Sequence, residues 1–150
     1  INVSGRIYLP PLDCPFQSVN SIIQRLRDSA DFIIVDFHAE ATSEKLALGY
    51  YFDGRVTAVL GTHTHIQTAD EKILPAGTAY ITDLGMTGPS DSILGMEKDK
   101  IIQKFLNGLP ARFEVAGGPA QLQGVILSVD DNTGKAVGIT RYSYSLNDHM

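Results

Sequence analysis

Three of the four histidines follow directly after short apolar runs that have the character of buried strands. His38 follows residues 32–37 (FIIVDF), and His63 and His65 follow residues 56–60 and one glycine. Because ligands of open α/β sheets gather outside the carboxyl ends of strands, we expect the three imidazoles to meet at one sheet edge. Residues two apart in an extended segment point the same way, so His63 and His65 can serve one site. Neutral imidazole suits zinc, iron, manganese or nickel, so the pattern predicts a metal site.

Carboxylates close to these histidines in the sequence could support such a site. A metal-bound imidazole usually donates its second ring N–H to an acceptor, and Asp36 or Asp83 could fill that role. Acids at strand ends also serve as turn or capping residues, and that reading fits the same pattern. Glu40, two residues after His38, is a candidate contact to the metal or to bound water.

Other chemistry-bearing residues give weaker signals. Cys14 has no neighbouring base and no electropositive setting in the sequence, which argues against a nucleophile. The glycine-rich segment 85–89 matches no phosphate-cradling motif, and it could close over a substrate, line a subunit contact or only connect elements. His149 stands one residue from the end, and we expect it to be solvated and outside the site.

The elements that must position these residues alternate by type along the chain. Strands are predicted at residues 1–8, 32–37, 56–60 and 79–82, and the central runs look covered on both faces. Helices are predicted after an N-cap at Ser18, after Thr42 or Ser43 as far as about Tyr51, and over residues 98–109. On the last of these helices, four apolar side chains are expected to face the protein interior: Ile101, Ile102, Phe105 and Leu106.

The last part of the chain has a different pattern. Residues 121–129 and 137–146 read as two strands around the turn sequence Asp131-Asn132-Thr133-Gly134, which predicts a hairpin. Alternating strands and helices followed by a hairpin favour an α/β layered architecture with a mixed sheet.

Composition bounds the class of protein. With 43 % hydrophobic and 19 % charged residues among 150, the chain can bury a core and does not have the composition of a disordered protein. The net charge of −5 argues against binding nucleic acid by bulk electrostatics. A single cysteine, no apolar run of about 18 residues and no secretory signal predict a cytoplasmic protein without membrane spans. Because Ile1 opens directly into a strand-like run, we expect the chain to be cut from a longer one.

Several longer strings are shared with one enzyme family. They are residues 35–45 (VDFHAEATSEK), 53–56 (DGRV), 61–65 (GTHTH), 67–70 (QTAD), 73–75 (ILP), 77–80 (GTAY), 82–83 (TD) and 85–89 (GMTGP). This combination, from Ile1 nearly to the end, resembles the YmdB-like metallophosphoesterases of the calcineurin-like superfamily. It is far more specific than a single H-x-H pair.

The resemblance implies a four-layer αββα metallophosphoesterase fold, of which residues 1–150 would form the C-terminal part of a single domain. It implies a phosphodiesterase that hydrolyses 2′,3′-cyclic or 3′,5′-cyclic nucleotides with two divalent ions, iron, manganese or zinc. By analogy with the superfamily, His38 and His63 would hold one ion and His65 the other.

The chain also departs from the family pattern. Family members begin with a segment that carries an aspartate ligand, a Glu-Asn pair and a Gly-Asn-His motif, and none of these is present. The ligands in question include the carboxylate that bridges the metals and the histidine thought to act as acid. We therefore assign no catalytic residue within the chain, and we expect an N-terminal segment as its partner, low activity alone, and self-association.

Two other functions stay open. One is a mononuclear zinc hydrolase with a His₃ site, although the metallo-β-lactamase pattern H-x-H-x-D fails because Gln67 stands at the aspartate position. The other is a folded domain that binds metal or a partner without turnover. The number of metal ions per chain distinguishes the mononuclear zinc hydrolase from a dinuclear enzyme. A phosphodiesterase assay distinguishes either enzyme from the domain without turnover.

Overall fold

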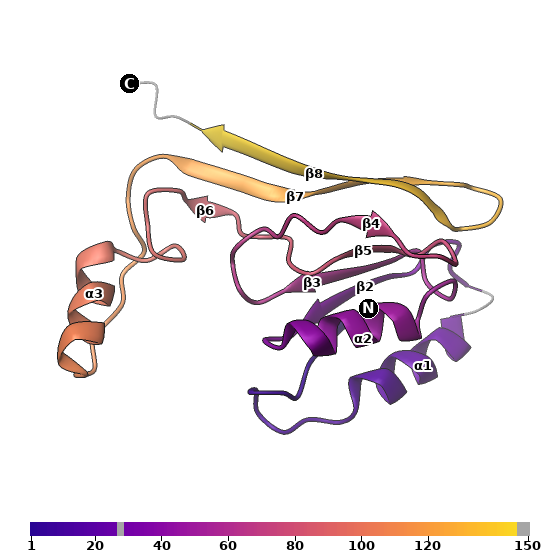
Figure 1. Ribbon diagram of the computed structural model, residues 1–150, viewed down its shortest axis with the longest axis horizontal. Coiled ribbons are helices and arrows are strands. Elements are labelled where there is room, and N and C mark those ends of the chain that lie inside the picture. The colour runs from indigo at the N-terminus through magenta and orange to yellow at the C-terminus, as the bar shows by residue number, and fades with distance from the viewer. Residues whose placement is uncertain (27–28, 147–150) are drawn as a thin grey trace.

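A mixed five-stranded sheet forms the centre of the protein, seen in a computed structural model that describes residues 1–26 and 29–146 (Figure 1). The strand order is β1-β2-β3-β5-β4, in which the first four strands are parallel and β4 is antiparallel to β5. The strands are β1 (Asn2–Ser4), β2 (Ile34–His38), β3 (Ala58–Thr62), β5 (Ala79–Ile81) and β4 (Lys72–Ile73). The predicted α/β class with a mixed sheet is confirmed.

Two helices, α1 (Pro15–Leu26) and α2 (Thr42–Tyr51), cover one face of this sheet. Apolar side chains spaced along each helix meet the inward residues of β2 and β3 in one core cluster, which includes Val19, Ile23, Val35, Phe37, Leu48, Phe52 and Val59. Burial of this area drives the packing of both helices on the sheet.

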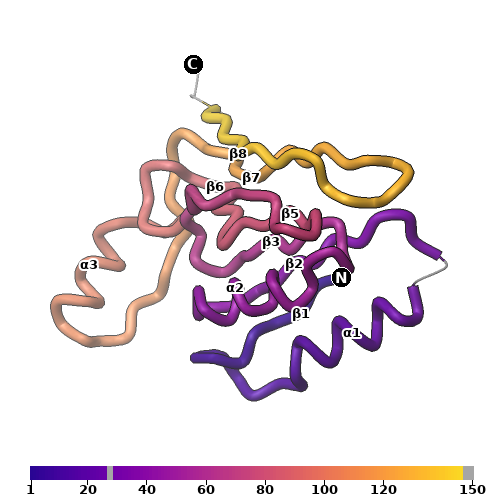
Figure 2. The backbone as a smooth tube through the Cα atoms, turned by 45° about the vertical axis from the view of Figure 1, so that its right-hand side comes forward, coloured from indigo at the N-terminus to yellow at the C-terminus, as the bar shows by residue number. Residues whose placement is uncertain are grey.

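A second, antiparallel sheet covers the other face. It contains β6 (Gly88–Pro89), β7 (Ala120–Val129) and β8 (Ala136–Leu146). Its inward residues Val125, Leu127 and Ile139 pack against Ala58, Leu60, Ala79 and Ile81 of the first sheet. Figure 2 shows the resulting layers of helices, sheet and sheet. Of the four layers expected for αββα, the described residues form three.

The predicted hairpin is present between β7 and β8. The Asp130 carboxylate accepts hydrogen bonds from the backbone N–H groups of Asn132 and Thr133, and Gly134 adopts a positive φ of 68°. This is a turn chemistry that glycine at the last position favours, as the sequence indicated.

The third helix, α3 (Lys98–Asn107), lies to one side of the two sheets rather than on a sheet face (Figures 1 and 2). The inner face predicted for it is therefore wrong in most positions. Ile101 is buried, but Ile102, Phe105 and Leu106 are 46 %, 82 % and 75 % exposed. The helical period was right, but the apolar stripe meets no layer among the described residues.

Local tertiary contacts change three predicted boundaries. The first strand ends at Ser4 rather than residue 8, because the backbone N–H of Arg6 donates to the Glu44 carboxylate instead of a neighbouring strand. Helix α1 begins at Pro15, before Ser18, since proline suits the first position of a helix. The N-cap of α2 is Ala41, without a side-chain cap, so the capping roles predicted for the two residues after it are wrong.

Coverage of the strands also differs from the prediction. The prediction of burial on both faces holds for β3, in which four of the five residues are buried. In β2 the burial alternates, and Ile34 is 43 % exposed, because the second sheet contacts β4 and β5 instead. The two-residue strands β4 and β6 were not predicted, since so short a run carries no period. None of the described helices is long and apolar enough to cross a membrane.

Candidate metal centre

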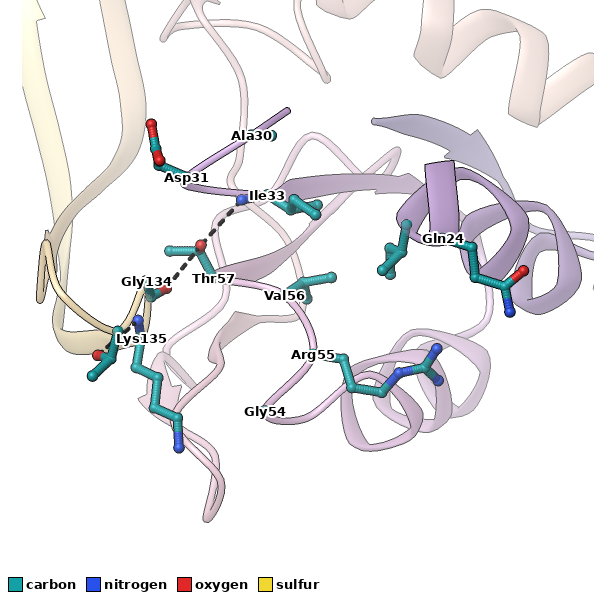
Figure 3. Close-up of a pocket in the computed structure, with 12 residues that line it drawn as sticks. Gln24, Ala30, Asp31, Ile33, Gly54, Arg55, Val56, Thr57, Gly134 and Lys135 are labelled. Atoms are coloured by element: carbon teal, nitrogen blue, oxygen red, sulfur yellow. Dashed lines mark hydrogen bonds between the residues drawn. The ribbon is translucent and has the colours of Figure 1, made fainter. Parts of the chain in front are cut away.

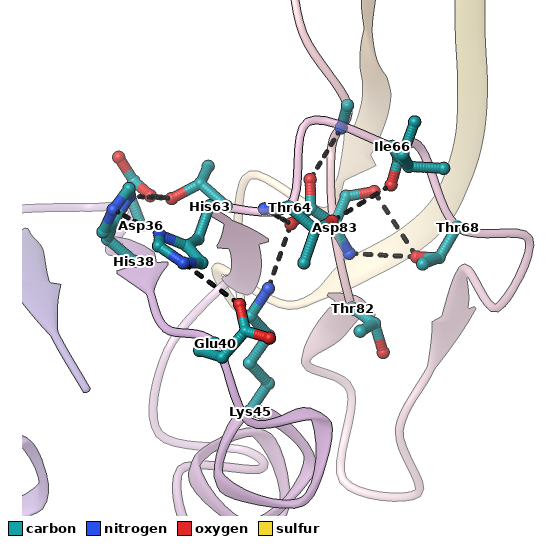
Figure 4. A network of polar contacts seen from close by, with 12 residues as sticks. Asp36, His38, Glu40, Lys45, His63, Thr64, Ile66, Thr68, Thr82 and Asp83 are labelled. Carbon is teal, nitrogen blue, oxygen red and sulfur yellow. Dashed lines mark hydrogen bonds and ion pairs between the residues drawn. The ribbon is translucent and has the colours of Figure 1, made fainter. Parts of the chain in front are cut away.

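The histidine-bearing edge of the sheet is formed by the carboxyl ends of parallel strands. His38 is the last residue of β2 and lies directly opposite Thr62, the last residue of β3. Asp83 follows two residues after the end of β5. Figure 4 shows His38, His63 and Asp83 near one another at this edge. The sequence-based expectation that ligand-type residues meet at this edge is correct for His38 and His63.

Two imidazoles form the centre of the site. Nε2 of His38 lies 3.0 Å from Nδ1 of His63, and the two rings stand at 89° to each other with centroids 4.7 Å apart. Both side chains are partly buried. The two nitrogens therefore lie within hydrogen-bond distance of each other at the carboxyl edge of the sheet.

The other ring nitrogen of each histidine has its own acceptor. Nδ1 of His38 lies 3.3 Å from the hydroxyl of Thr62, and Nε2 of His63 lies 3.0 Å from Oε2 of Glu40. Glu40 thus touches the far side of the imidazole, which is the usual place of a supporting carboxylate rather than of a metal ligand. Its predicted contact to a metal or to bound water stays a prediction, and the contact observed is the one to His63.

His65 does not join the pair in a single cluster. It is exposed, and its Nδ1 lies 3.2 Å from the backbone carbonyl oxygen of Leu94, which leaves Nε2 without a hydrogen-bond partner among the described residues. The extended geometry expected for residues 63–65 is absent, because His63 and His65 have φ values of +113° and +65°. The side-chain alternation of an extended segment, on which the expectation for the H-x-H pair depended, therefore does not apply to these residues.

Left-handed φ values are rare for residues other than glycine and cost free energy, so the surrounding structure must hold this loop. The Asp83 carboxylate holds the loop through hydrogen bonds to its backbone. Its Oδ2 accepts the N–H of Thr64 at 2.9 Å, and its Oδ1 accepts the N–H of Gly85 at 3.0 Å. Nζ of Lys45 lies 3.0 Å from the same Oδ2, and both side chains are buried. The buried Asp83 carboxylate, whose charge is balanced by Lys45, therefore holds the loop in place.

The supporting acids therefore differ from those predicted. Asp83 contacts backbone N–H groups and Lys45, not a histidine ring. Asp36 also makes no direct contact with an imidazole: its Oδ1 accepts the hydroxyl of Thr62 at 2.8 Å, and that hydroxyl faces His38. Thr62 and Lys45 lie in the strings 61–65 and 35–45, but no role was predicted for either from the sequence, because a threonine at a strand end and a lysine on a helix are ordinary surface choices.

The far end of the histidine loop is held by Asp70. Its Oδ1 accepts the hydroxyl of Thr68 at 2.6 Å and the backbone N–H of Thr82 at 3.1 Å. Burial alone would raise the pKa of the Asp70 carboxyl, but the hydrogen bonds from Thr68 and Thr82 together outweigh it and hold the pKa below its usual value. The loop is thus clamped at both ends to the strand end of β5.

Gln67 joins this loop to the second sheet. Its Nε2 lies within hydrogen-bond distance of the carbonyl oxygens of Leu84, Gly124 and Tyr142, at 3.2, 2.8 and 3.3 Å. The residue that excludes a metallo-β-lactamase pattern therefore has a structural role between the layers.

The donor set is compatible with a metal ion. Two imidazole nitrogens bound to one tetrahedral ion at about 2.0–2.1 Å lie about 3.3 Å apart, a few tenths of an ångström more than the observed 3.0 Å. Each of the three histidines also has an acceptor for one ring N–H, which leaves the other nitrogen as an unprotonated donor. Among residues 1–26 and 29–146, no three His, Cys, Asp or Glu side chains form a ready-made metal site. The described residues supply part of a coordination sphere.

The remaining candidates lie elsewhere. Cys14 is free and precedes α1, and its carbonyl oxygen accepts the N–H of Ser18 within that helix. The glycine-rich segment 85–89 connects β5 to the second sheet and contributes β6, so its connecting role is confirmed. His149 lies outside the described residues.

A pocket of about 390 Å³ opens at the opposite edge of the sheet, between the start of β3 and the hairpin (Figure 3). Thr57 lines it, and its hydroxyl is already used, accepting the N–H of Ile33 and donating to the carbonyl of Gly134. Because α/β sheets bind ligands at the carboxyl ends of strands, this hollow is not the functional edge.

Comparisons with known proteins find relatives in sequence and in fold. A 2′,3′-cyclic-nucleotide 2′-phosphodiesterase from Bacillus subtilis is 57 % identical over 150 residues, which are 100 % of this chain and 56 % of that protein. The crystal structure of a hypothetical protein from Thermus thermophilus matches 97 % of this chain and 56 % of its own, with 44 % identity and a TM-score of 0.91.

The crystal structure of a novel phosphatase from Mycoplasma pneumoniae matches 99 % of this chain and 53 % of its own, with 42 % identity and a TM-score of 0.88. The chain therefore spans about half the length of the relatives it matches. Residues 1–142 match the family model described as YmdB-like protein. The chain belongs to the YmdB-like protein family.

Proposed function

We propose that this chain supplies the histidine side of a metal-dependent phosphodiesterase that hydrolyses cyclic nucleotides. The substrate would be a 2′,3′-cyclic nucleotide, whose 2′ phosphoester bond is opened by water to leave the 3′-phosphate. The observation that carries the proposal is the pair of facing nitrogens, His38 Nε2 and His63 Nδ1, 3.0 Å apart at the carboxyl edge of the sheet. The name of the Bacillus subtilis relative supports the substrate class.

Three histidines would hold the metals. His38 and His63 would share one divalent ion, and His65 would bind the second through its Nε2, since its Nδ1 faces the Leu94 carbonyl. When bound, two such ions supply Lewis acidity towards the phosphate and a hydroxide nucleophile near neutral pH. Iron, manganese and zinc are all compatible with imidazole ligands.

The chain's own residues keep these donors in place. Glu40 holds the His63 ring from its far nitrogen, and Thr62 does the same for His38. The buried pair of Lys45 and Asp83 fixes the backbone between the two loop histidines. Because imidazoles are neutral, anionic ligands from the rest of the full-length protein would offset the charge of two divalent ions.

A mononuclear His₃ zinc hydrolase has less support. Such a site needs three imidazoles around one ion, and the described residues bring two together while His65 turns to Leu94. A non-catalytic domain would still bind metal, so turnover distinguishes it.

The test is to purify the full-length protein, count its metals by mass spectrometry, and assay 2′,3′-cyclic and 3′,5′-cyclic adenosine monophosphate. His38→Ala and His63→Ala should each lower turnover at least about 100-fold, because losing a ligand is no milder than losing its supporting group. His149→Ala, a histidine outside every motif, is the matched control and should stay close to wild type.

Near wild-type turnover and metal content in either ligand variant would contradict the assignment. One zinc per chain with full activity would favour the mononuclear enzyme. Metal binding without hydrolysis of either nucleotide would favour the non-catalytic domain.

A further inference from the structure

A row of polar side chains crosses three strands beside the histidine pair. In the strand register Asn2 of β1 lies opposite Asp36 of β2, and Thr62 of β3 lies opposite His38. Nδ2 of Asn2 donates to Oδ2 of Asp36 at 2.7 Å, and Oγ1 of Thr62 donates to Oδ1 of Asp36 at 2.8 Å. Oγ1 of Thr62 also lies 3.3 Å from Nδ1 of His38. The four side chains form one continuous chain of hydrogen bonds.

The chemistry of the groups sets the direction of this chain. A carboxylate only accepts hydrogen bonds, so both neighbours of Asp36 must donate to it. A hydroxyl has one hydrogen, and Thr62 directs it at Asp36. Thr62 can then only accept from His38, so in the neutral ring the proton of His38 sits on Nδ1 and Nε2 carries the lone pair.

The same argument applies to the second ring of the pair. Oε2 of Glu40 lies 3.0 Å from Nε2 of His63, so that nitrogen donates to the carboxylate and Nδ1 is the nitrogen that faces His38. These two nitrogens, His38 Nε2 and His63 Nδ1, lie within hydrogen-bond distance of each other at 3.0 Å, so at most one of them carries a proton in the metal-free structure. A cation that replaced this proton would meet two nitrogen donors.

We propose that Asp36 and Thr62 are positioning residues that hold the proton of His38 on Nδ1 and thereby present its Nε2 as a metal ligand. The proposal rests on the proposed function only in naming the cation as a metal. A protonated nitrogen cannot bind a metal. If the proton of His38 sat on Nε2 instead, it would have to move to Nδ1 before Nε2 could bind. Loss of such a supporting group typically weakens metal binding about 10–100-fold.

Replacing Asp36 with the near-isosteric asparagine should reverse the direction of donation between residue 36, Thr62 and His38. In Asp36→Asn, with Asn2 keeping its Nδ2 toward position 36, the introduced amide offers its oxygen to Asn2 and turns its NH₂ group to Thr62. The hydroxyl of Thr62 would then accept from the amide and donate to Nδ1 of His38. The proton of His38 would move to Nε2, the nitrogen that faces the metal position.

Two substitutions of Thr62 complete the set. Thr62→Val removes the hydroxyl with little change of volume, so no acceptor fixes the proton of His38. Thr62→Ser keeps the hydroxyl and is the matched control. The Asn2, Glu40 and His63 side chains are unchanged in all three variants.

The tautomer is measured directly by ¹⁵N NMR of the histidine rings in the metal-free full-length protein at neutral pH, with His38 assigned by its absence from His38→Gln. Wild type and Thr62→Ser should carry the proton on Nδ1, and Asp36→Asn on Nε2. Zinc and manganese titrations by calorimetry should show affinity lowered about 10–100-fold in Asp36→Asn and Thr62→Val, and near wild type in Thr62→Ser.

A wild-type His38 protonated on Nε2, or an Asp36→Asn variant with the wild-type tautomer, would overturn the proposal. So would undiminished affinity in Asp36→Asn with the tautomer reversed. The predicted tautomers in a protein that binds neither metal would support the hydrogen-bond chain and contradict the proposed function. If Thr62→Val fails to fold, Asp36→Asn and Thr62→Ser decide the question between them.

Discussion

Lys45 and Asp83 form an ion pair with an N–O distance of 3.0 Å, and their side chains are 1 % and 0 % exposed (Figure 4). The pair joins α2 to the end of β5, directly beneath the loop that carries His63. The Asp83 carboxylate also accepts hydrogen bonds from two backbone N–H groups, so its negative charge is stabilised by three donors in all. A buried charge of this kind is tolerated only while its partner is present.

Removing the cation should therefore destabilise the protein strongly. We expect Lys45→Met to lower the free energy of unfolding by about 3–5 kcal/mol, because it leaves the buried Asp83 carboxylate uncompensated. Lys98→Met is the control, since Lys98 pairs with Asp91 on the surface and such pairs contribute about 0–1 kcal/mol. Urea denaturation measures both, and equal small losses would show that the buried pair has no special role.

Gln67 offers a test of how the histidine loop is joined to the second sheet. In Gln67→Glu the amide donor becomes a carboxylate that faces the carbonyl oxygens of Leu84 and Gly124. We expect a loss of about 1–3 kcal/mol in the free energy of unfolding at neutral pH, because the carbonyls lose their donor. Thermal unfolding measures it, with Gln103→Glu on α3 as the control. An unchanged melting temperature would contradict the bridging role.

Asp70 should make stability depend on pH in a defined direction. Its pKa is held below the ordinary value of 3.8 in the folded protein, so it stabilises the fold above about pH 4. That contribution is lost as the pH falls below 3.8 through the lowered pKa. We expect Asp70→Asn to be less stable than wild type at pH 7, by about 1–3 kcal/mol, and the difference to shrink below about pH 4.

The measurement for Asp70 is urea denaturation at several pH values between about 3 and 7, which span the ordinary titration range of a carboxyl group. Asp131→Asn, in the exposed turn of the hairpin, is the control and should follow wild type throughout. A difference that persists undiminished at the lowest pH would mean that the charge of Asp70 is not what stabilises the loop.

Residues 1–150 alone should be nearly inactive as a phosphodiesterase. The described part brings two imidazole donors together, whereas catalytic zinc sites have three protein ligands, and removing ligands should lower turnover at least about 100-fold. The assay uses bis(p-nitrophenyl) phosphate with manganese or iron, and the segment of the Bacillus subtilis relative that this chain does not match, added separately, should raise the rate. Full activity without that segment would show that its ligands are dispensable.

Much of the fold could be read from local patterns. The alternation of apolar runs and amphipathic helices placed β2, β3, β5, α1 and α2 to within a few residues, and Asp131-Asn132-Thr133-Gly134 marked the hairpin correctly. These features depend on residues close in sequence, whose period and turn chemistry carry the information. The inner face of α3 was wrong because its period says which residues share a face, but not which layer covers them.

For the site, the sequence by itself determined the family strings and the position of His38 and His63 at strand ends. Only the tertiary structure decided which nitrogens face each other and what holds them. Thr62 comes to His38 through strand pairing, Glu40 turns to His63, and the buried Lys45 reaches Asp83 from a helix. His65 is separated from its neighbour by backbone conformations that H-x-H spacing does not reveal. Such contacts join residues 19 to 38 positions apart, or depend on φ values, and neither leaves a local pattern in the chain.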